Sequence, residues 1–218
     1  MKTLRTVPFR SLPLLCSLLA APLIAQVPAT APVKPTTATL KPVAKPTAAA
    51  RTSEHGPINW VGLEQAMDLA KRDGKPILID VYTQWCGPCK MLAGKTFTDK
   101  QLAEYVNKNF HAVKFDAEGQ GDVTFKGQKY GNPEFRPENM GMRNGTHQLT
   151  MAIAPVNGRV AYPTVVYMDA DGNILAPVQG YLTPEQMEPI LIYFGEGVYK
   201  KQDYQSFQST FTTRRTAE

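Results

Sequence analysis

The sequence predicts an α/β domain in which a central mixed β-sheet is flanked by helices. Between residues 59 and 116, short apolar runs typical of buried strands alternate with amphipathic helical patterns. Two strand patterns then meet at the turn 169–173, and a last helical pattern follows. Such an order of elements is typical of a three-layer α/β fold. A chain of 218 residues with 43% hydrophobic side chains is long enough to bury the core of one such domain.

The elements up to the first cysteine of the domain follow from apolar spacing and cap residues. Asn59 is expected to cap a helix that includes Trp60 on its apolar face and ends at Gly74. The run 76–82 is short and apolar, as in a central strand covered on both sides. A further helix is expected from Cys86, because the proline two residues later favours a first turn.

Later elements are predicted by the same signals. The segment Thr98–Gln101 resembles a capping box ahead of a helix over 102–107. His147 is expected as a polar residue at the opening of another helix. The remaining elements are strands at 110–116, 164–168 and 174–178, and helices at 146–154 and from 183 or 184 to about 194.

The N-terminal residues are typical of an export signal. Residues 1–25 combine three basic side chains with an apolar run that ends in small residues, and this run is shorter than the roughly 20 residues that span a bilayer. We therefore expect cleavage of 1–25 and an exported, periplasmic protein; the alternative is an uncleaved segment that tethers it to a membrane. Residues 26–54 are rich in proline, alanine and threonine, which predicts a disordered linker before a domain at 55–218.

The net charge of +5 does not indicate nucleic acid binding. Residues 1–54 hold seven basic residues and one acidic residue, so the remainder of the chain carries a net charge of −1. A domain so close to neutral lacks the basic surface that nucleic acids require. We expect no nucleic acid partner.

The chemistry of the domain is expected at its two cysteines, Cys86 and Cys89. The third cysteine, Cys16, lies in the expected signal and would be lost with it. A bridge that closes so small a loop removes little unfolded-state entropy and stabilises the fold little. A cysteine at a helix N-terminus is favoured as a thiolate, and a second cysteine one turn further on can reach it. This predicts thiol-disulfide exchange with Cys86 as the exposed nucleophile and Cys89 as the buried resolving thiol.

The sequence gives no sign of a metal site or of a bound cofactor. A zinc site would need two further ligands, and the three histidines of the chain show no ligand spacing. The sequence contains no flavin or nicotinamide fingerprint either. Electrons must therefore arrive through the cysteine pair itself.

The run from Asp80 to Lys90, with Trp85 directly before the first cysteine, resembles the active-site segment of the thioredoxin family. The order of elements is similar to that family over about residues 58–195, and the chain as a whole resembles the exported thioredoxin-like proteins of Bacteroidetes-type bacteria. The resemblance implies a thioredoxin fold and catalysis by the redox-active pair Cys86 and Cys89.

The resemblance also implies roles for residues outside the cysteine pair. Asp80 takes the position of a buried acid that assists proton transfer at the resolving thiol, and Lys114 that of a lysine beside it. Pro163 takes the position of a cis-proline, where the preceding residue, Tyr162, offers backbone groups to an extended substrate. From the residues alone, these would be a solvated aspartate, a surface lysine and a strand-entry proline. Substrate contacts are implied for Trp85, Gly87, Pro88, Tyr162 and Pro163.

Two segments depart from the family pattern. An insertion at 118–142 precedes the proline segment and is expected to hold a small hairpin over 123–130. It is either a substrate-selecting lip beside the active site or an inert surface addition. An extension at 195–218 carries Tyr204, Phe207 and Phe211 on one helical face, which predicts packing against the domain; a partner-binding face is the alternative.

The expected function is reduction or relay of disulfides in exported proteins. The Gly-Pro spacer between the cysteines resembles that of reducing family members, and a reductase in an oxidising compartment implies a membrane-bound electron donor. One alternative is the same chemistry in the opposite sense, as a disulfide oxidase or isomerase. Another is a non-catalytic binding or assembly module with this fold. The oligomeric state has no signature in the sequence.

Overall fold

A five-stranded sheet organises residues 56–216, the part of the chain that the computed structural model describes. Its strand order is β1-β3-β2-β6-β7. The first three strands of this order run parallel, and β6 and β7 are each antiparallel to the strand before them, so the sheet is mixed, as predicted. The strands are β1 (Trp60–Val61), β2 (Ile77–Tyr82), β3 (His111–Asp116), β6 (Thr164–Met168) and β7 (Ile174–Gln179).

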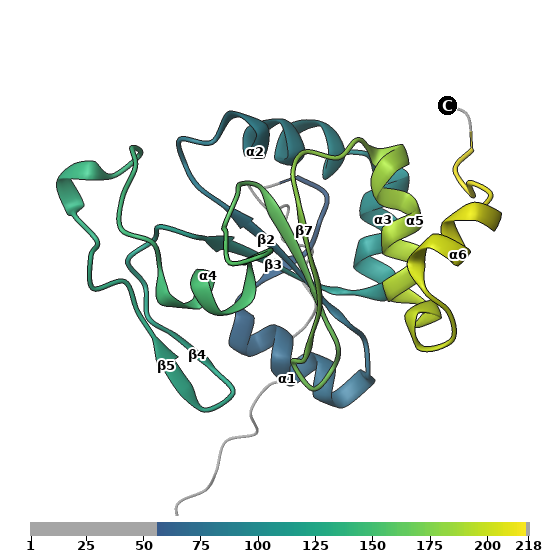
Figure 1. Cartoon of the computed structure of the whole chain (residues 1–218), viewed down its shortest axis with the longest axis horizontal. Coiled ribbons are helices and arrows are strands. Elements are labelled where there is room, and N and C mark those ends of the chain that lie inside the picture. Colours follow the sequence, from purple (N-terminus) through teal and green to yellow (C-terminus); the bar gives the residue numbers. More distant parts are fainter. Residues whose placement is uncertain (1–55, 217–218) are drawn as a thin grey trace, which may run out of the picture. The chain divides into compact units, whose positions relative to one another are not determined.

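Helices pack on both faces of this sheet (Figure 1). Side chains of β2 alternate between two cores, because successive residues of a strand point to opposite faces. Leu78 packs with residues of α3 and α5, whereas Ile77 and Ile79 pack with residues of α1 and α4. The helices are α1 (Leu63–Asp73), α2 (Gly87–Met91), α3 (Lys100–Asn109), α4 (Gln148–Ile153), α5 (Pro184–Gly195) and α6 (Tyr204–Thr210).

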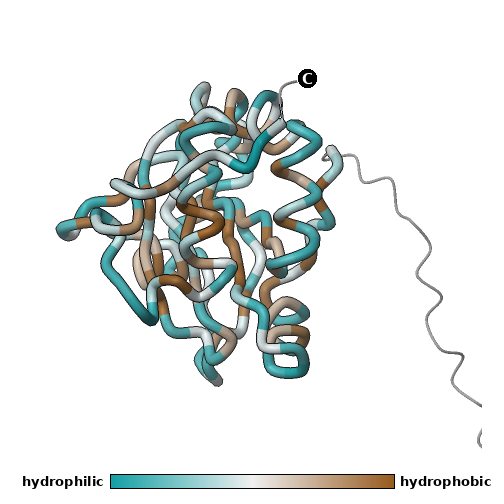
Figure 2. Tube along the Cα trace, turned by 90° about the vertical axis from the view of Figure 1, so that its right-hand side faces the viewer, coloured by the Kyte–Doolittle hydropathy of each residue, from teal (hydrophilic) through white to brown (hydrophobic). Residues whose placement is uncertain are grey.

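Hydropathy follows this layering. Figure 2 shows the apolar segments gathered in the interior and the hydrophilic segments on the outer turns and helix faces. The first five residues of β2 are buried, which agrees with the prediction of a strand covered on both sides, and all five residues of β6 are buried as well. Both faces of β2 are therefore packed against a core. The strand ends at Tyr82, shortly before Cys86.

Two predictions at helix starts were wrong. Trp60 lies in β1, not in a helix, because it pairs with Ala112 of β3; α1 begins at Leu63 after Gly62. The expected capping box beginning at Thr98 is also absent. Asp99 caps α3 instead, and its carboxylate accepts a hydrogen bond from the Leu102 amide at 2.8 Å.

The expected face of the C-terminal extension packs on the domain, as predicted. Phe207 is buried in the core that α3 and α5 share, and its ring centroid lies 5.5 Å from that of Tyr193. Tyr204 and Phe211 are half-buried against the same core. The extension is thus part of the folded domain.

The segment after α6 is fastened by two arginines. Arg215 donates to both carboxylate oxygens of Asp99, at 2.9 and 2.7 Å. Arg214 forms a similar pair with Glu196, at 2.6 and 3.2 Å. Bidentate pairs of this kind fix geometry as well as charge.

The expected leader at 1–25 and linker at 26–54 lie outside the described residues. Within residues 56–216, no helix has the length and apolar character needed to cross a membrane.

Candidate active site

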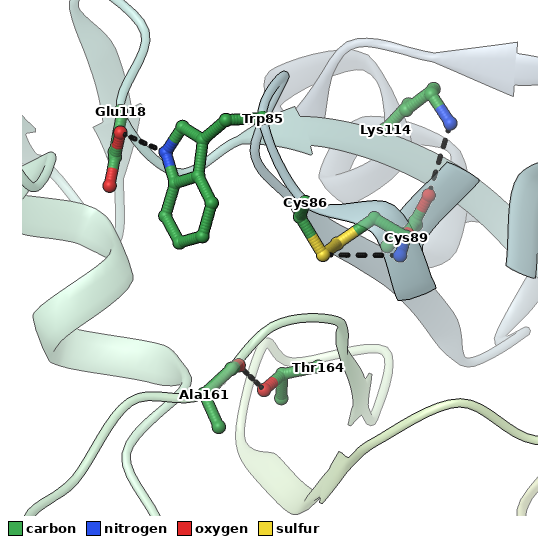
Figure 3. The surroundings of a disulfide bond; sticks show 8 residues. Trp85, Cys86, Cys89, Lys114, Glu118, Ala161 and Thr164 are labelled. Atoms are coloured by element: carbon green, nitrogen blue, oxygen red, sulfur yellow. Dashed lines mark hydrogen bonds and ion pairs between the residues drawn. A yellow bond between two sulfur atoms is a disulfide. The ribbon is translucent and has the colours of Figure 1, made fainter. Parts of the chain in front are cut away.

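The cysteine pair lies where β2 gives way to α2. Cys86 and Cys89 form a disulfide with an S–S distance of 2.09 Å and a Cα–Cα distance of 5.3 Å. Cys86 is the N-cap of α2, and its Sγ accepts a hydrogen bond from the Cys89 amide at 3.1 Å (Figure 3). Gly87 and Pro88 form the first turn of the helix. The Cys86 sulfur therefore sits where helix amides favour a negative charge.

The expected difference in exposure between the two cysteines was wrong. Each is only 3% exposed in the disulfide-bonded pair. The two sulfurs differ instead in what they face. Cys86 lines a surface pocket together with Trp85 and Tyr162, and Cys89 does not line it. Access to the pair from this pocket is therefore through Cys86.

Asp80 and Lys114 form an ion pair in the sheet. They are register partners on β2 and β3, and the Lys114 ammonium lies 3.1 Å from Asp80 Oδ2. Asp80 is 1% exposed and its Oδ1 accepts no hydrogen bond from the described residues. Burial raises the pKa of Asp80, and the charge of Lys114 opposes this without reversing it. The carboxyl thus holds a proton more readily than an ordinary aspartate does.

Lys114 is itself confined by aromatic rings. Its ammonium lies 4.7 Å from the ring centroid of Tyr82 and 5.3 Å from that of Trp60. The side chain is 17% exposed, so it is not the free surface lysine of the alternative interpretation. The sheet register brings this cation to Asp80 from a distant part of the sequence.

The peptide bond between Tyr162 and Pro163 is cis, as the resemblance implied. The Pro163 carbonyl accepts a hydrogen bond from the Gly180 amide at 2.8 Å, which ties the segment to the chain after β7. The Tyr162 ring meets Trp85 edge to face, with centroids 5.9 Å apart. Among the described residues, neither the amide nor the carbonyl of Tyr162 has a hydrogen-bond partner.

Two residues that the sequence did not single out hold Trp85 in place. Glu118 accepts hydrogen bonds from the Trp85 indole N–H and from the Asn144 amide, both at 2.8 Å. The Arg143 guanidinium lies over the Trp85 ring, 4.2 Å from its centroid. Glu118 opens the insertion and Arg143 follows its last residue. The only feature of the sequence that points to Glu118 or Arg143 is their position at the two ends of this insertion.

The insertion is a folded excursion. Its strands β4 (Val123–Phe125) and β5 (Gln128–Tyr130) form the expected hairpin, with positive φ at Lys126 and Gly127 in the turn. The buried Asn132 side chain donates to carbonyls of Glu118, Gly119 and Gly145 and so joins its two ends. His147 caps α4 as expected: its Nδ1 accepts from the Leu149 amide at 3.1 Å, and its Nε2 contacts the Gly121 carbonyl.

Within the described range, 56–216, no group of three or more histidine, cysteine, aspartate or glutamate side chains is arranged to hold a metal ion. The chemistry available at the site is that of two sulfurs at a helix N-terminus, a buried carboxyl group and an aromatic wall.

Comparison with known proteins identifies the family of the chain. The family model of a thioredoxin-like domain matches residues 63–195. Thioredoxin 1 of Chlorobaculum tepidum is 36% identical over 66 residues, which are 30% of this chain and 62% of that protein. Spermatogenesis-associated protein 20 of Rattus norvegicus is 33% identical over 70 residues, which are 32% of this chain and 9% of that protein.

The chain thus spans less than two thirds of either relative. Among solved structures, a thioredoxin-fold protein from Helicobacter pylori is 18% identical. The match covers 63% of this chain and 80% of that one, with a TM-score of 0.42.

Proposed function

Because the chain belongs to the thioredoxin-like domain family, we propose that it is a thiol-disulfide oxidoreductase that reduces disulfide bonds of other proteins. One observation carries this proposal: a disulfide at the N-terminus of α2 whose first sulfur, that of Cys86, lines a surface pocket. A structural staple would not need a partner to reach its sulfur. A bridge between Cys86 and Cys89 also closes too short a loop to stabilise the fold much.

The exchange proceeds in two steps. The Cys86 thiolate attacks one sulfur of the substrate disulfide; a bond forms between them, the substrate S–S bond breaks, and the departing thiolate takes up a proton. Cys89 then gives its proton to the Asp80 carboxylate, and its sulfur attacks Cys86. The mixed disulfide breaks, its substrate sulfur leaves as a thiolate that takes up a proton, and the Cys86–Cys89 bond forms. Two electrons have then passed from the dithiol to the substrate. A dithiol of a donor protein restores the starting state by the same exchange.

The proposed roles of Asp80 and Lys114 follow from their environment. A buried carboxyl with a raised pKa gains and releases a proton closer to neutral pH than an ordinary aspartate, as a general acid or base requires. Lys114 acts through Asp80: its ammonium, 3.1 Å away, limits how far burial raises that pKa. It is a positioning residue.

The substrate would lie along the wall of the pocket that contains Cys86. Trp85, Gly87, Pro88 and Tyr162 all line this pocket. The unpaired amide and carbonyl of Tyr162 suit it to hydrogen-bond an extended polypeptide, in the manner of a strand added to a sheet edge. Pro163, buried behind it, fixes the direction in which these groups point.

The proposal also includes the compartment of the protein and the source of its electrons. The basic and apolar pattern of residues 1–25 supports export to the periplasm, where clients would be exported proteins. A reductase there requires electrons from outside that compartment, and a membrane-bound dithiol protein would supply them.

Insulin reduction in the presence of a small dithiol tests the proposal. We expect turnover by the wild type, and no turnover above that of the dithiol alone by Cys86→Ser or Cys89→Ser. Lack of turnover by a folded wild type would favour the binding-module alternative instead. Equilibration with glutathione gives the direction: a potential well below that of the glutathione pool marks a reductase, and one above it marks an oxidase or isomerase.

A further inference from the structure

Arg143 gives the Cys86 pocket a charge that no step of the exchange uses. Of the pocket-lining residues within the described range, Arg143 is the one cation and Glu118 the one anion. Tyr162, which also lines the pocket, adds no charge, because burial raises the pKa of its hydroxyl to about 12. The charge that a substrate meets beside Cys86 therefore depends on these two side chains.

The Glu118 carboxylate already accepts hydrogen bonds from two neighbours. One of its carboxylate oxygens accepts both the Trp85 indole N–H and the Asn144 amide. Figure 3 shows Trp85 between Glu118 and the cysteine pair, so the indole separates this carboxylate from the sulfur that reacts. The one anionic side chain that lines the pocket is therefore hydrogen-bonded to its neighbours, and the Trp85 ring lies between it and Cys86.

Arg143 has the opposite character. It is exposed, and it forms neither an ion pair nor a hydrogen bond with any described residue. Its guanidinium stacks over Trp85, 4.2 Å from the ring centroid, a contact that holds its plane but leaves its N–H groups unused. Trp85 is itself fixed by Glu118 and by the Tyr162 edge, so the guanidinium rests on a rigid platform. A planar donor held in this way is suited to bind a carboxylate bidentately.

We propose that Arg143 is a specificity-determining residue that selects polypeptide disulfides flanked by an acidic side chain. The inference rests on the proposed function and deepens it. For Cys86 to attack, a substrate cysteine must enter the pocket that Arg143 also lines, and the residues beside that cysteine must follow it in. A glutamate or aspartate there meets the guanidinium, whereas a lysine or arginine is repelled by it.

Three synthetic peptides test this, each with the same disulfide and with glutamate, glutamine or lysine beside the reacting cysteine. We expect the wild type to have a kcat/KM for the glutamate peptide about two- to five-fold above that for the glutamine peptide, the range that exposed ion pairs contribute. Added salt should reduce this preference, because the pair is exposed to solvent. The lysine peptide should fall below the glutamine peptide.

Variants separate the charge from the fold. Arg143→Gln should remove the preference for the glutamate peptide over the glutamine peptide, and Arg143→Glu should reverse it. Arg143→Lys should retain only part of it, because an ammonium group cannot bind a carboxylate bidentately. The matched control is Arg136→Gln, because Arg136 is an exposed arginine of the insertion that does not line the pocket. It should behave as the wild type does.

An unchanged preference in Arg143→Gln would overturn the inference, as would an equal loss of preference in Arg136→Gln. Turnover of all three peptides at one rate by the wild type would overturn this inference alone. No turnover of any peptide would overturn the proposed function and the inference together.

Discussion

Replacing Asp80 by asparagine removes a carboxylate that is 1% exposed while keeping its shape. Burial raises the pKa of this group, so the native state keeps the proton to a higher pH than the unfolded chain, in which the carboxyl has its ordinary pKa of 3.8. The free energy of unfolding of the wild type therefore falls as pH rises from that value through the raised pKa. Asparagine has no such dependence, and we expect the variant to be more stable at neutral pH.

The size of the gain follows from the surroundings of the pair. Replacing both partners of a buried ion pair by neutral residues of similar volume often stabilises a protein by about 1–4 kcal/mol, whereas removing one partner costs about 3–5 kcal/mol when the other charge is left buried and uncompensated. Here one charge is removed, and the other, Lys114, keeps its contact with Tyr82 and is 17% exposed. We therefore expect a gain in the lower half of that range, about 1–2 kcal/mol at neutral pH.

Urea unfolding of the oxidised proteins across the acidic-to-neutral range measures this gain. The gain in stability should shrink toward low pH, where the wild-type carboxyl is protonated and therefore uncharged, as the asparagine side chain is. The control is Asp73→Asn: although desolvation raises the pKa of Asp73, its contacts with His111 and Lys75 outweigh it, and the net shift is downward. That variant should lose stability at neutral pH. An Asp80→Asn variant that is less stable than the wild type at neutral pH, or whose gain does not depend on pH, would refute the reasoning.

Three further variants test the packing. Arg215→Met removes the bidentate pair with Asp99, and this pair lowers the pKa of the Asp99 carboxyl. The variant should therefore have a free energy of unfolding about 0.5–1 kcal/mol lower than the wild type at neutral pH. This difference should disappear as acid protonates Asp99. Gly145→Ala places a Cβ 2.6 Å from the backbone of Glu134, so urea unfolding should show a loss of about 1–3 kcal/mol. Phe207→Ala should lower stability by about 3 kcal/mol in the same assay, and an unchanged midpoint would mean that α6 is not part of the core.

Local patterns predicted most of the elements, because the residues that decide them are neighbours in sequence. The apolar runs of β2 and β6 and the hairpin of the insertion are examples. Trp60 was placed in a helix because its spacing from the next apolar residues fits a helical turn. What holds it in a strand is pairing with Ala112, far along the chain, and no local pattern contains that information.

The cysteine pair is predicted by its own motif, and Asp80 and Lys114 by the family resemblance, whereas the charged residues around Trp85 are not predicted. Glu118 and Arg143 converge on Trp85 only because the insertion between them folds back on itself. Tyr162, which approaches from the segment before β6, likewise meets Trp85 and lines the pocket of Cys86 from a distant part of the chain. Side chains that meet across such distances leave no spacing signature in the sequence.

In the proposed mechanism, the Cys86 sulfur attacks a partner and the Cys89 sulfur releases it. Its most direct test is a Cys89→Ser variant, reduced and then mixed with a disulfide-bonded protein, followed by mass spectrometry of the adducts. We expect a stable mixed disulfide on Cys86, and none in a Cys86→Ser variant treated in the same way. Failure of the Cys89→Ser protein to form any adduct, or a stable adduct on Cys89 of the Cys86→Ser protein in its place, would contradict it.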